Sequence, residues 1–354
     1  MLRFLTAGES HGKAMVAILE GMSAGLRIDL AKINQELKRR QAGFGRGVRM
    51  QIENDRAEIF SGLKNNKTLG SPLTLLIRNK DFSIERLPKV ICPRPGHADL
   101  SGLLKYGFTD IRNVLERASA RNTAVIVGIG AICKIFLEEF KIKISSRVLS
   151  IGGENNIGSM KDKISEAIRL KDTVGGIFEV RAKGLPVGLG SYVQPDERLD
   201  GRLAQAVMSI PGIKALEIGL GFGYAVSFGS EVHDAIYRGK GLSPQGIVPK
   251  RYFRKTNNAG GIEGGVSNGE ELVIRACMKP ISTLMNPLDS VNIKTNRPSK
   301  AAVERSDTCV VSAAGVVAES SCAYVLADAM LEKFGSDSLG DIKENYKNYL
   351  RRIT

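Results

Sequence analysis

The sequence predicts an α+β fold rather than a doubly wound parallel sheet. Strand-like segments do not alternate regularly with helices, and each half of the chain carries strands, a helix and more strands. No clear linker or low-complexity tract divides the 354 residues. We therefore expect one domain over 1–354 with antiparallel-rich sheets flanked by helices, and an internal duplication of 1–140 and 141–354 stays open.

The first elements follow from capping and periodicity. A short strand is expected at 2–6. A helix is expected next, because apolar residues recur at helical spacing after Asp29, whose side chain is suited to cap it. Three cations at its C-terminal end, before the glycine–arginine loop 43–49, suit the helix dipole. Further strands are expected at 50–54, 57–61 and 73–78.

The middle of the chain joins an irregular segment to a long helix. Pro93 and Pro95 exclude a helix around them, so we expect 80–105 to be an irregular loop that faces a ligand. Asp110 can cap one continuous helix over 110–140. Later elements are expected as strands near 143–150, 176–183, 214–229 and 271–277, a glycine-rich segment at 257–269, and helices near 200–209 (capped by Asp200), 317–334 and 339–351.

The charge of the chain favours an anionic partner. The net charge of +14 suits nucleic acid, an anionic membrane surface or a phosphorylated ligand, although a merely basic surface would explain part of it. Aromatic residues make up only 6%, tryptophan is absent and no nucleic-acid-binding motif is found. A nucleic-acid partner is therefore disfavoured.

Apolar segments and cysteine spacing predict where the protein is located and whether its thiols are reduced. No apolar run resembles a membrane span or a signal peptide, so we expect a cytoplasmic protein with no membrane partner. Five scattered cysteines, none at C-x-x-C spacing, predict reduced and mostly buried thiols and no metal site. No Walker A, H-E-x-x-H, G-x-S-x-G or dinucleotide-binding pattern is present.

Two groups of arginines are candidates for anion binding. Arg40, Arg46 and Arg49 accompany the glycine-rich loop, where the backbone can approach a ligand closely. Arg117 and Arg121 stand at i, i+4, so one helix face would hold both, and they would repel each other without an anion between them. Solvated loop and helix faces are the alternatives for the two groups.

The histidines are few and lie in restricted company. His11 lies in the stretch Gly8–Gly12 and His97 in the stretch Arg94–Asp99, and an imidazole can transfer a proton near neutral pH. Asp307 and the segment 279–283 would be ordinary surface groups if taken alone. His233 has no comparable neighbours and is interpreted as structural or exposed.

Five motifs in this order resemble those of the chorismate synthase family over almost the whole chain. They are Gly8–Gly12, Gly45–Met50, Arg94–Asp99, Arg117–Arg121 and the stretch Arg305–Glu319. The resemblance implies a β-α-β sandwich, a homotetramer and a carbon–oxygen lyase acting on phosphates. The implied reaction is the anti 1,4-elimination of phosphate from 5-enolpyruvylshikimate 3-phosphate to give chorismate, the last step of the shikimate pathway in aromatic amino-acid biosynthesis. It uses reduced FMN without net redox change, and NADPH enters only as a reductant in some members.

The resemblance also implies roles for individual residues. His11 would protonate the departing phosphate, His97 would protonate or hydrogen-bond the reduced flavin, and Asp307 would act with flavin N5 in removing the C6 proton. Ser10 and Ser119 would support the hydrogen-bond network. The substrate would be held by Arg40, Arg46, Arg49, Arg94 and Arg121. The flavin would be lined by Arg117, Ala118, Ser119, Gly264, Lys279, Pro280, Ile281, Ser282, Thr283 and Arg305.

Three positions depart from the usual family pattern. Ser306 stands where many members have His, Ser23 where proline is usual and Asn122 where Glu is usual, and none of them is assigned chemistry. The lack of a nicotinamide fingerprint and of a large insertion favours a monofunctional enzyme that takes its flavin reduced. Two other classes are weighed against this one: an FMN-dependent oxidoreductase acting on a phosphorylated substrate, and a nucleic-acid-binding module.

Overall fold

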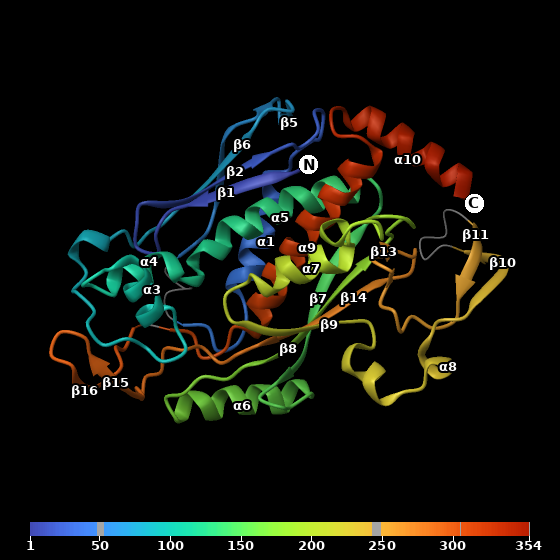
Figure 1. The fold of residues 1–354 in the computed structure, drawn as a ribbon. Coiled ribbons are helices and arrows are strands. Elements are labelled where there is room, and N and C mark those ends of the chain that lie inside the picture. Colours follow the sequence, from blue (N-terminus) through green and yellow to red (C-terminus); the bar gives the residue numbers. More distant parts are fainter. Residues whose placement is uncertain (48–52, 243–248, 305, 354) are drawn as a thin grey trace.

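Two four-stranded antiparallel sheets enclose a layer of helices in the computed structural model (Figure 1). The structure describes residues 1–47, 53–242, 249–304 and 306–353. Within these ranges the sheets and the helices between them form the main apolar core. The predicted class, an α+β fold with antiparallel-rich sheets, is confirmed.

The first sheet has the strand order β1-β2-β6-β3 and is antiparallel throughout. Its strands are β1 (Arg3–Ala7), β2 (Ala14–Glu20), β3 (Ala57–Ser61) and β6 (Leu73–Arg78), with the short ladder β4 (Leu63–Lys64) and β5 (Lys67–Thr68) between the last two. Leu73, Leu75 and Ile77 of β6 alternate into the core, as the period of two requires.

The second sheet has the strand order β7-β8-β14-β9 and is also antiparallel. Its strands are β7 (Lys143–Ile151), β8 (Gly176–Lys183), β9 (Ile213–Ile218) and β14 (Leu272–Met278). Short antiparallel pairs lie outside both sheets: β10 (Ile236–Leu242) with β11 (Pro249–Arg254), β12 (Ile262–Glu263) with β13 (Val266–Ser267), and β15 (Asp289–Asn292) with β16 (Arg297–Lys300).

The helix layer covers the inner face of each sheet. α5 (Thr123–Glu138) and α1 (Leu30–Gln41) contact the first sheet, while α9 (Val311–Phe334) and α7 (Leu199–Met208) contact the second. α5 and α9 pack closely, because a Cβ on Gly130 would lie 2.2 Å from the Cβ of Ser320. The outer helices are α3 (Asp99–Tyr106), α4 (Arg112–Ala118), α6 (Ile157–Arg169), α8 (Gly229–Val232) and α10 (Leu339–Ile353).

A buried ionic group ties the helix layer together. Glu319 of α9 is fully buried and accepts hydrogen bonds from Arg39 of α1, at 2.7 Å, and from Lys134 of α5. The Ser146 hydroxyl of β7 donates to the same carboxylate at 2.5 Å. Because a buried charge is costly unless it is paired, Glu319 favours one relative placement of these three helices.

Two helical segments are long and apolar enough to cross a membrane by length and composition, which the sequence analysis did not recognise. They are Arg112–Glu138 and Val311–Phe334. In the most apolar window of Val311–Phe334, 94% of the residues are buried inside the molecule, and α5 packs on α9. Core position therefore accounts for their hydropathy, as expected for a helix that is apolar on all sides.

Several sequence predictions of local structure are wrong. The helix expected over 110–140 is interrupted at Ser119, which has φ −66° and ψ 141°, and 3₁₀ turns replace the end of the strand expected over 214–229. α3 begins at Asp99, inside the segment expected to be irregular. α7 begins at Leu199, so Asp200 lies in its first turn and is not its cap. The strand expected at 50–54 falls largely outside the described residues.

Other predictions of local structure are confirmed. Asp29 caps α1 by accepting a hydrogen bond from the Ala31 backbone, and 93–98 is irregular. Elements missed altogether include β2 and α6. Both sheets receive their strands in the same order along the chain, and α5 and α9 follow the last strand of their respective sheets. This order is compatible with the internal duplication, which stays a prediction.

Candidate active site

The motif residues gather where loops from both halves meet near α3 and α4, at one end of the molecule (Figure 1). The loop between β1 and β2 carries His11, the end of α1 carries Arg40, and the break between α4 and α5 carries Ser119. The C-terminal half contributes the segments 279–283 and 306–309. Residues distant in the sequence therefore share one polar region.

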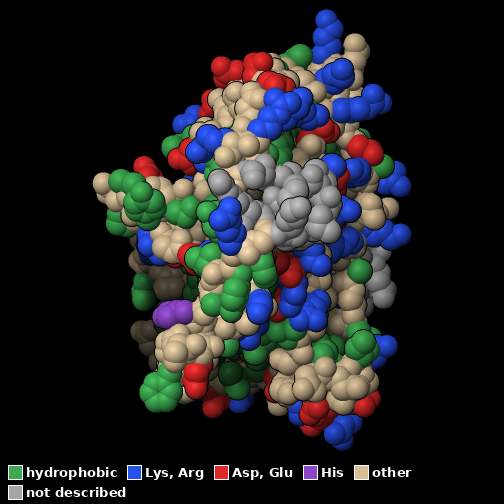
Figure 2. Space-filling model, turned by 90° about the vertical axis from the view of Figure 1, so that its right-hand side faces the viewer, with side chains coloured by type: hydrophobic (Ala, Val, Ile, Leu, Met, Phe, Trp, Pro, Cys, Tyr) green, Lys and Arg blue, Asp and Glu red, His purple; other side chains and the backbone are tan. Residues whose placement is uncertain are grey.

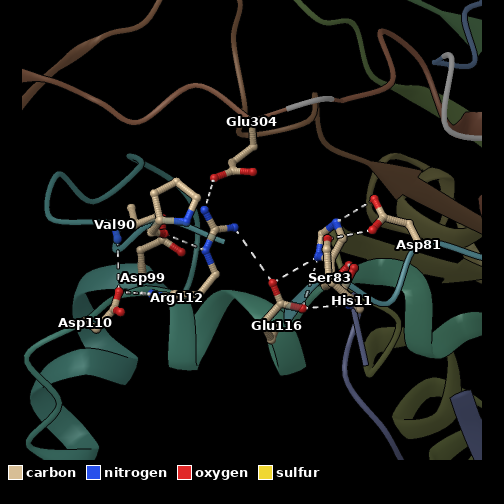
Figure 3. Close-up of polar contacts among 12 residues, drawn as sticks. His11, Asp81, Ser83, Val90, Asp99, Asp110, Arg112, Glu116 and Glu304 are labelled. Atoms are coloured by element: carbon tan, nitrogen blue, oxygen red, sulfur yellow. Dashed lines mark hydrogen bonds and ion pairs between the residues drawn. The ribbon is translucent and has the colours of Figure 1, made fainter. Parts of the chain in front are cut away.

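His11 is held by a buried carboxylate that the sequence analysis did not select. Glu116 of α4 accepts a hydrogen bond from the His11 backbone N–H at 2.7 Å, and its oxygens lie 3.0 and 3.1 Å from His11 Nδ1 (Figure 3). Asp81 lies on the other side of the ring, with Oδ2 4.0 Å from Nε2. Burial would raise the pKa of Glu116, but hydrogen bonds from the His11 ring and backbone hold it below its usual value.

The loop that carries His11 is anchored by Asn79 and by two serines. Asn79 Nδ2 donates to the carbonyl of Gly12 at 2.7 Å, and its Oδ1 accepts from Arg121 Nε at 2.8 Å. The Ser119 hydroxyl donates to the Ser10 hydroxyl at 3.1 Å. His11 is therefore connected to the arginine cluster through its own loop.

Two arginines share one buried carboxylate. Asp55 lies between Arg121, whose Nη1 donates to it at 2.6 Å, and Arg40, whose Nη1 donates to it at 3.2 Å. Both arginines are 4% exposed. Burial lowers the pKa of Arg40 to about 10; Asp55 opposes this, and the nearby cations Arg121 and Arg46 lower it further. Three arginines thus lie close together around Asp55, with Asp307 beside Arg46 and Glu53 beside Arg121, and guanidinium groups gathered in this way can bind an anionic ligand.

Arg46 reaches the same cluster because its loop docks on the segment after residue 305. Its Nη1 donates to the Arg40 carbonyl at 2.9 Å, and its Nε lies 3.2 Å from Asp307. Gly47 donates its backbone N–H to Asp307 at 2.5 Å, and a Cβ there would lie 2.8 Å from the Ser306 carbonyl. Glycine is thus required by this close approach.

Two buried guanidinium nitrogens in this cluster have no hydrogen-bond partner among the residues that the structure describes. They are Nε of Arg46, which lies 3.2 Å from Asp307 Oδ2, and Nη2 of Arg121, which lies 3.9 Å from Glu53 Oε2, in ion pairs without a well-formed hydrogen bond. Buried donors are nearly always satisfied by protein, water or ligand. Each nitrogen therefore keeps an N–H whose hydrogen bond a bound anion can complete.

His97 lies in a second carboxylate-bound arrangement. Its Nδ1 is 2.5 Å from Asp99, which also accepts from Arg94 Nε at 2.8 Å. Arg94 Nη1 in turn donates to the Thr283 hydroxyl at 2.7 Å. Burial would raise the pKa of Asp99, but the bonds from His97 and Arg94 hold it well below its usual range. Arg94 therefore braces the His97 loop against the C-terminal half.

The 279–283 segment adds a cation beside this loop. Lys279 donates to the Gly96 carbonyl and to the Ser282 hydroxyl, and Ser282 donates to the same carbonyl at 2.8 Å. Burial lowers the pKa of Lys279, and Lys214 lowers it further. Gly264 has φ +59° and no atom within 4 Å of a Cβ placed on it, so it borders open space.

The expected arginine pair on α4 is not formed. Because the helix breaks at Ser119, Arg117 turns to the carbonyls of Thr6 and Gly8, at 2.9 and 3.0 Å, while Arg121 turns into the buried cluster. Spacing of i, i+4 therefore does not place them on one face, and the proposed anion site between them is wrong. Arg117 also donates to Asn122 Oδ1 at 3.2 Å.

Some predicted site residues stand apart from the geometry above. Arg49 and Arg305 lie outside the described residues, and His233 is exposed, as expected. Ala118, Pro280 and Ile281 contribute no charged side chain. Sequence reasoning missed the carboxylates and the amide that hold the selected groups in place: Asp55, Asn79, Asp81, Asp99 and Glu116. Asp99 belongs to the motif Arg94–Asp99 and its partners are two and five residues away, but no local pattern marks the other four, whose partners are mostly far away in the sequence.

The side chains of this region limit the chemistry that it can carry out to proton transfer and the binding of anions. Imidazoles bound to carboxylates transfer protons, and buried guanidinium groups hold phosphate or carboxylate groups in a fixed orientation. Both lie at one end of an α+β sandwich. The arrangement belongs to the class of small-molecule enzymes that carry out acid–base chemistry on an anionic substrate.

Comparison with known proteins narrows this class to one family. Residues 2–331 match the family model described as chorismate synthase. The chain is 52% identical to the chorismate synthase of Thermoanaerobacter pseudethanolicus over 352 residues, covering 99% of this chain and 98% of the relative. It is 48% identical to that of Aquifex aeolicus over 399 residues, with 99% and 98% covered.

A solved structure agrees. The chain resembles a crystal structure of chorismate synthase with a TM-score of 0.81 and 42% identity, covering 99% of this chain and 98% of that one. The chain belongs to the chorismate synthase family. The resemblance found in the sequence is thus confirmed.

Proposed function

We propose that this enzyme eliminates phosphate and a C6 hydrogen from 5-enolpyruvylshikimate 3-phosphate in an anti 1,4 sense, giving chorismate. This is a carbon–oxygen lyase reaction and the last step of the shikimate pathway. Family membership supports the proposal. The structural observation that carries it is the buried arginine cluster with two unsatisfied guanidinium nitrogens, joined by Asn79 to the loop that bears His11.

Substrate binding is assigned to the arginines. The substrate carries two carboxylates and a phosphate, which call for several cations. Arg40, Arg46 and Arg121 form the described part of this cluster, and Arg49 follows from the motif. Arg94, already bonded to Asp99 and Thr283, would face the substrate with the remaining N–H of its guanidinium.

Proton transfer is assigned to the two ends of the elimination. His11 donates a proton to the departing phosphate, whose negative charge grows as the C–O bond breaks. Ser10 and Ser119 keep the His11 loop in place through their mutual hydrogen bond. Asp307, which contacts Arg46 and the Gly47 N–H, is assigned with flavin N5 to the removal of the C6 proton. His97, held by Asp99, serves the cofactor side.

The residues present fit an anionic flavin. Lys279 donates to the neutral oxygens of Gly96 and Ser282, so these partners do not cancel its positive charge and an anion can pair with it. FMN would be held by Arg117, Ala118, Ser119, Gly264, Lys279, Pro280, Ile281, Ser282, Thr283 and Arg305. When bound, reduced FMN would lend electron density to the allylic system and take it back, with no net oxidation.

The remaining assignments extend the family resemblance. We propose a monofunctional cytoplasmic enzyme that receives its FMN already reduced, with NADPH at most an indirect reductant. We also propose a homotetramer. Exposed apolar residues near α8, among them Phe222, Val226 and Phe228, support an interface there. Lys and Arg are spread among acidic side chains over the face in Figure 2 rather than gathered in one stripe, so nucleic acid is not favoured as a partner.

An anaerobic assay tests the proposal. The protein is mixed with FMN, dithionite and 5-enolpyruvylshikimate 3-phosphate, and chorismate absorbance and phosphate release are followed. Absence of product, while a known chorismate synthase works in parallel, would refute it. Reductant consumed in proportion to product would instead indicate the flavin oxidoreductase.

Three histidine variants sharpen the assay. His11→Ala and His97→Ala are expected to lower turnover by about 10²–10⁴-fold, the usual contribution of a general acid or base, while flavin binding largely survives. His233→Ala is the matched control, because His233 is exposed and distant from the motifs in sequence, and it should keep full activity. Full activity in both of the first two variants would mean that the assigned roles are wrong.

A further inference from the structure

We propose that Glu116 is a positioning residue that fixes His11 in the tautomer with hydrogen on Nδ1 and leaves Nε2 as the atom that exchanges a proton. Only the group that receives the proton from Nε2, the departing phosphate, rests on the proposed function. It concerns a residue that neither the motifs nor the resemblance had selected. Figure 3 shows the carboxylate of Glu116 facing the His11 ring.

One carboxylate contacts both the ring and the backbone of His11. Oε2 accepts from the His11 N–H at 2.7 Å, and Nδ1 lies 3.0 and 3.1 Å from the two oxygens. The Glu116 backbone carbonyl also accepts from the Ser10 N–H at 2.9 Å. Glu116 therefore fixes the backbone of the His11 loop beside its carboxylate and contacts the ring from the same place.

The chemistry of the pair decides which ring nitrogen carries hydrogen. Glu116 is 3% exposed and its pKa lies below the usual value, so it is ionised near neutral pH. An ionised carboxylate only accepts hydrogen bonds, so Nδ1 must be the donor. In a neutral imidazole the other nitrogen, Nε2, is then the acceptor, and it is the atom that gains and loses the exchangeable proton.

The surroundings of the pair are consistent with this assignment. Asp81, the carboxylate on the Nε2 side, is 4.0 Å away, beyond hydrogen-bond distance, and the Ser83 hydroxyl donates to it at 2.6 Å. Arg112 lies on the far side of Glu116, with Nη1 3.8 Å from Oε1, and its Nη2 donates to Glu304 at 2.8 Å. The positive charge of Arg112 thus favours the ionised form of Glu116, and Arg112 is too far away to compete with His11 Nδ1 for a hydrogen bond to the carboxylate.

The first test needs no variant. Selective ¹⁵N-histidine labelling of the full chain gives signals from only three rings, which His97→Ala and His233→Ala assign by elimination. When the His11 ring is neutral, its Nδ1 is expected to show the chemical shift of a protonated nitrogen and its Nε2 that of a bare one. The opposite pattern, with hydrogen on Nε2 facing Asp81, would overturn the proposal.

The second test separates positioning from mere structure. Glu116→Gln keeps the shape but can present an N–H to Nδ1, so we expect a mixed or reversed tautomer. We expect kcat to fall by about 10–100-fold, as for other residues that orient a functional histidine, with KM changed by less than about twofold. Glu304→Gln also removes a carboxylate near Arg112 and is expected to leave the His11 ring signals unchanged.

A double-mutant cycle completes the argument. If Glu116 acts through His11, then Glu116→Gln has no further effect on kcat in the His11→Ala background. The same fold loss in both backgrounds would show that Glu116 acts independently and would refute the proposal. An Nδ1–H tautomer in a protein that makes no chorismate would leave the positioning role intact and reject the proposed function instead.

Discussion

Replacing Asp55 by Asn should destabilise the folded protein strongly. The change preserves the shape of the side chain but removes the negative charge that both Arg40 and Arg121 contact, and leaves Arg121 only with the more distant Glu53, 3.9 Å away. Both guanidinium groups are buried, so neither can turn to solvent for compensation. Breaking a buried ion pair by removing one partner costs about 3–5 kcal/mol, because the remaining charge stays desolvated.

The expected shift in melting temperature follows from the size of the chain. An unfolding entropy of about 2.1 cal/mol/K per residue over 354 residues is about 0.7 kcal/mol/K, so the loss corresponds to a fall of about 4–7 °C. Because the chain has no tryptophan, unfolding is best followed by far-UV circular dichroism. The measurement uses the protein without substrate, so that ligand binding does not contribute.

A matched variant and a clear outcome make this prediction decisive. Asp289→Asn removes the same charge from an ion pair with Lys300 in which both side chains are largely exposed, and its melting temperature should match that of the parent. If Asp55→Asn also melts within about 1 °C of the parent, a shift smaller than any expected from a buried charge, then Asp55 is not the counterion of the two arginines.

Two further predictions concern pH and packing. The pKa of Glu319 lies below its usual value of 4.5, since bonds from Arg39, Lys134 and Ser146 outweigh the effect of burial, and that of Asp99 is lowered likewise. The unfolded chain therefore binds more protons in acid, so the contribution of these two carboxylates is full above about pH 4.5 and is lost as the pH falls further. Melting temperatures at pH 7 and 5 should differ little through these groups, the one at pH 3 should be lower, and that fall should be smaller in Glu319→Gln. Gly130→Ala should cost about 1–3 kcal/mol by overpacking α5 against α9, whereas Gly201→Ala, whose Cβ would meet only contacts of 3.7 Å and more, should not destabilise; equal stability of the two variants would contradict the close helix packing.

Local signals in the sequence were sufficient for elements that depend on neighbouring residues. Asp29 predicts the start of α1, because a capping side chain accepts a hydrogen bond from a backbone N–H only two residues later. Pro93 and Pro95 predict an irregular segment, because proline restricts its own backbone and that of the residue before it. These features need no knowledge of the rest of the fold.

The break at Ser119 could not be predicted in the same way. No proline or glycine stands there, and the flanking residues are compatible with a helix. In the structure Ser119 is extended, and the two sides of the break bond to different segments: Arg117 to the end of β1, and Arg121 to Asp55 and Asn79. Tertiary contacts override local propensity at this point.

The candidate site was predictable only in part for a related reason. Unusual residues in glycine-containing motifs selected the groups that carry charge or exchange protons, such as His11 and Arg46. The groups that orient them were not selected, because Glu116 is 105 residues from His11 and Asp55 is 66 residues from Arg121. Which carboxylate accompanies which cation is decided by the packing of both sheets on the helix layer.

Two adjacent arginines near the end of α1 make the length of that helix critical. Arg39 bonds Glu319 in the centre of the molecule, whereas Arg40 bonds Asp55 in the candidate site. Successive residues of an α-helix differ by about 100° in direction, so one inserted or deleted residue within α1 would send each guanidinium to the wrong side. Insertions should therefore be tolerated in the exposed turn between β4 and β5 but not in α1. The rotational position of the residues of α1 links the packing of the core to the arrangement of the candidate site.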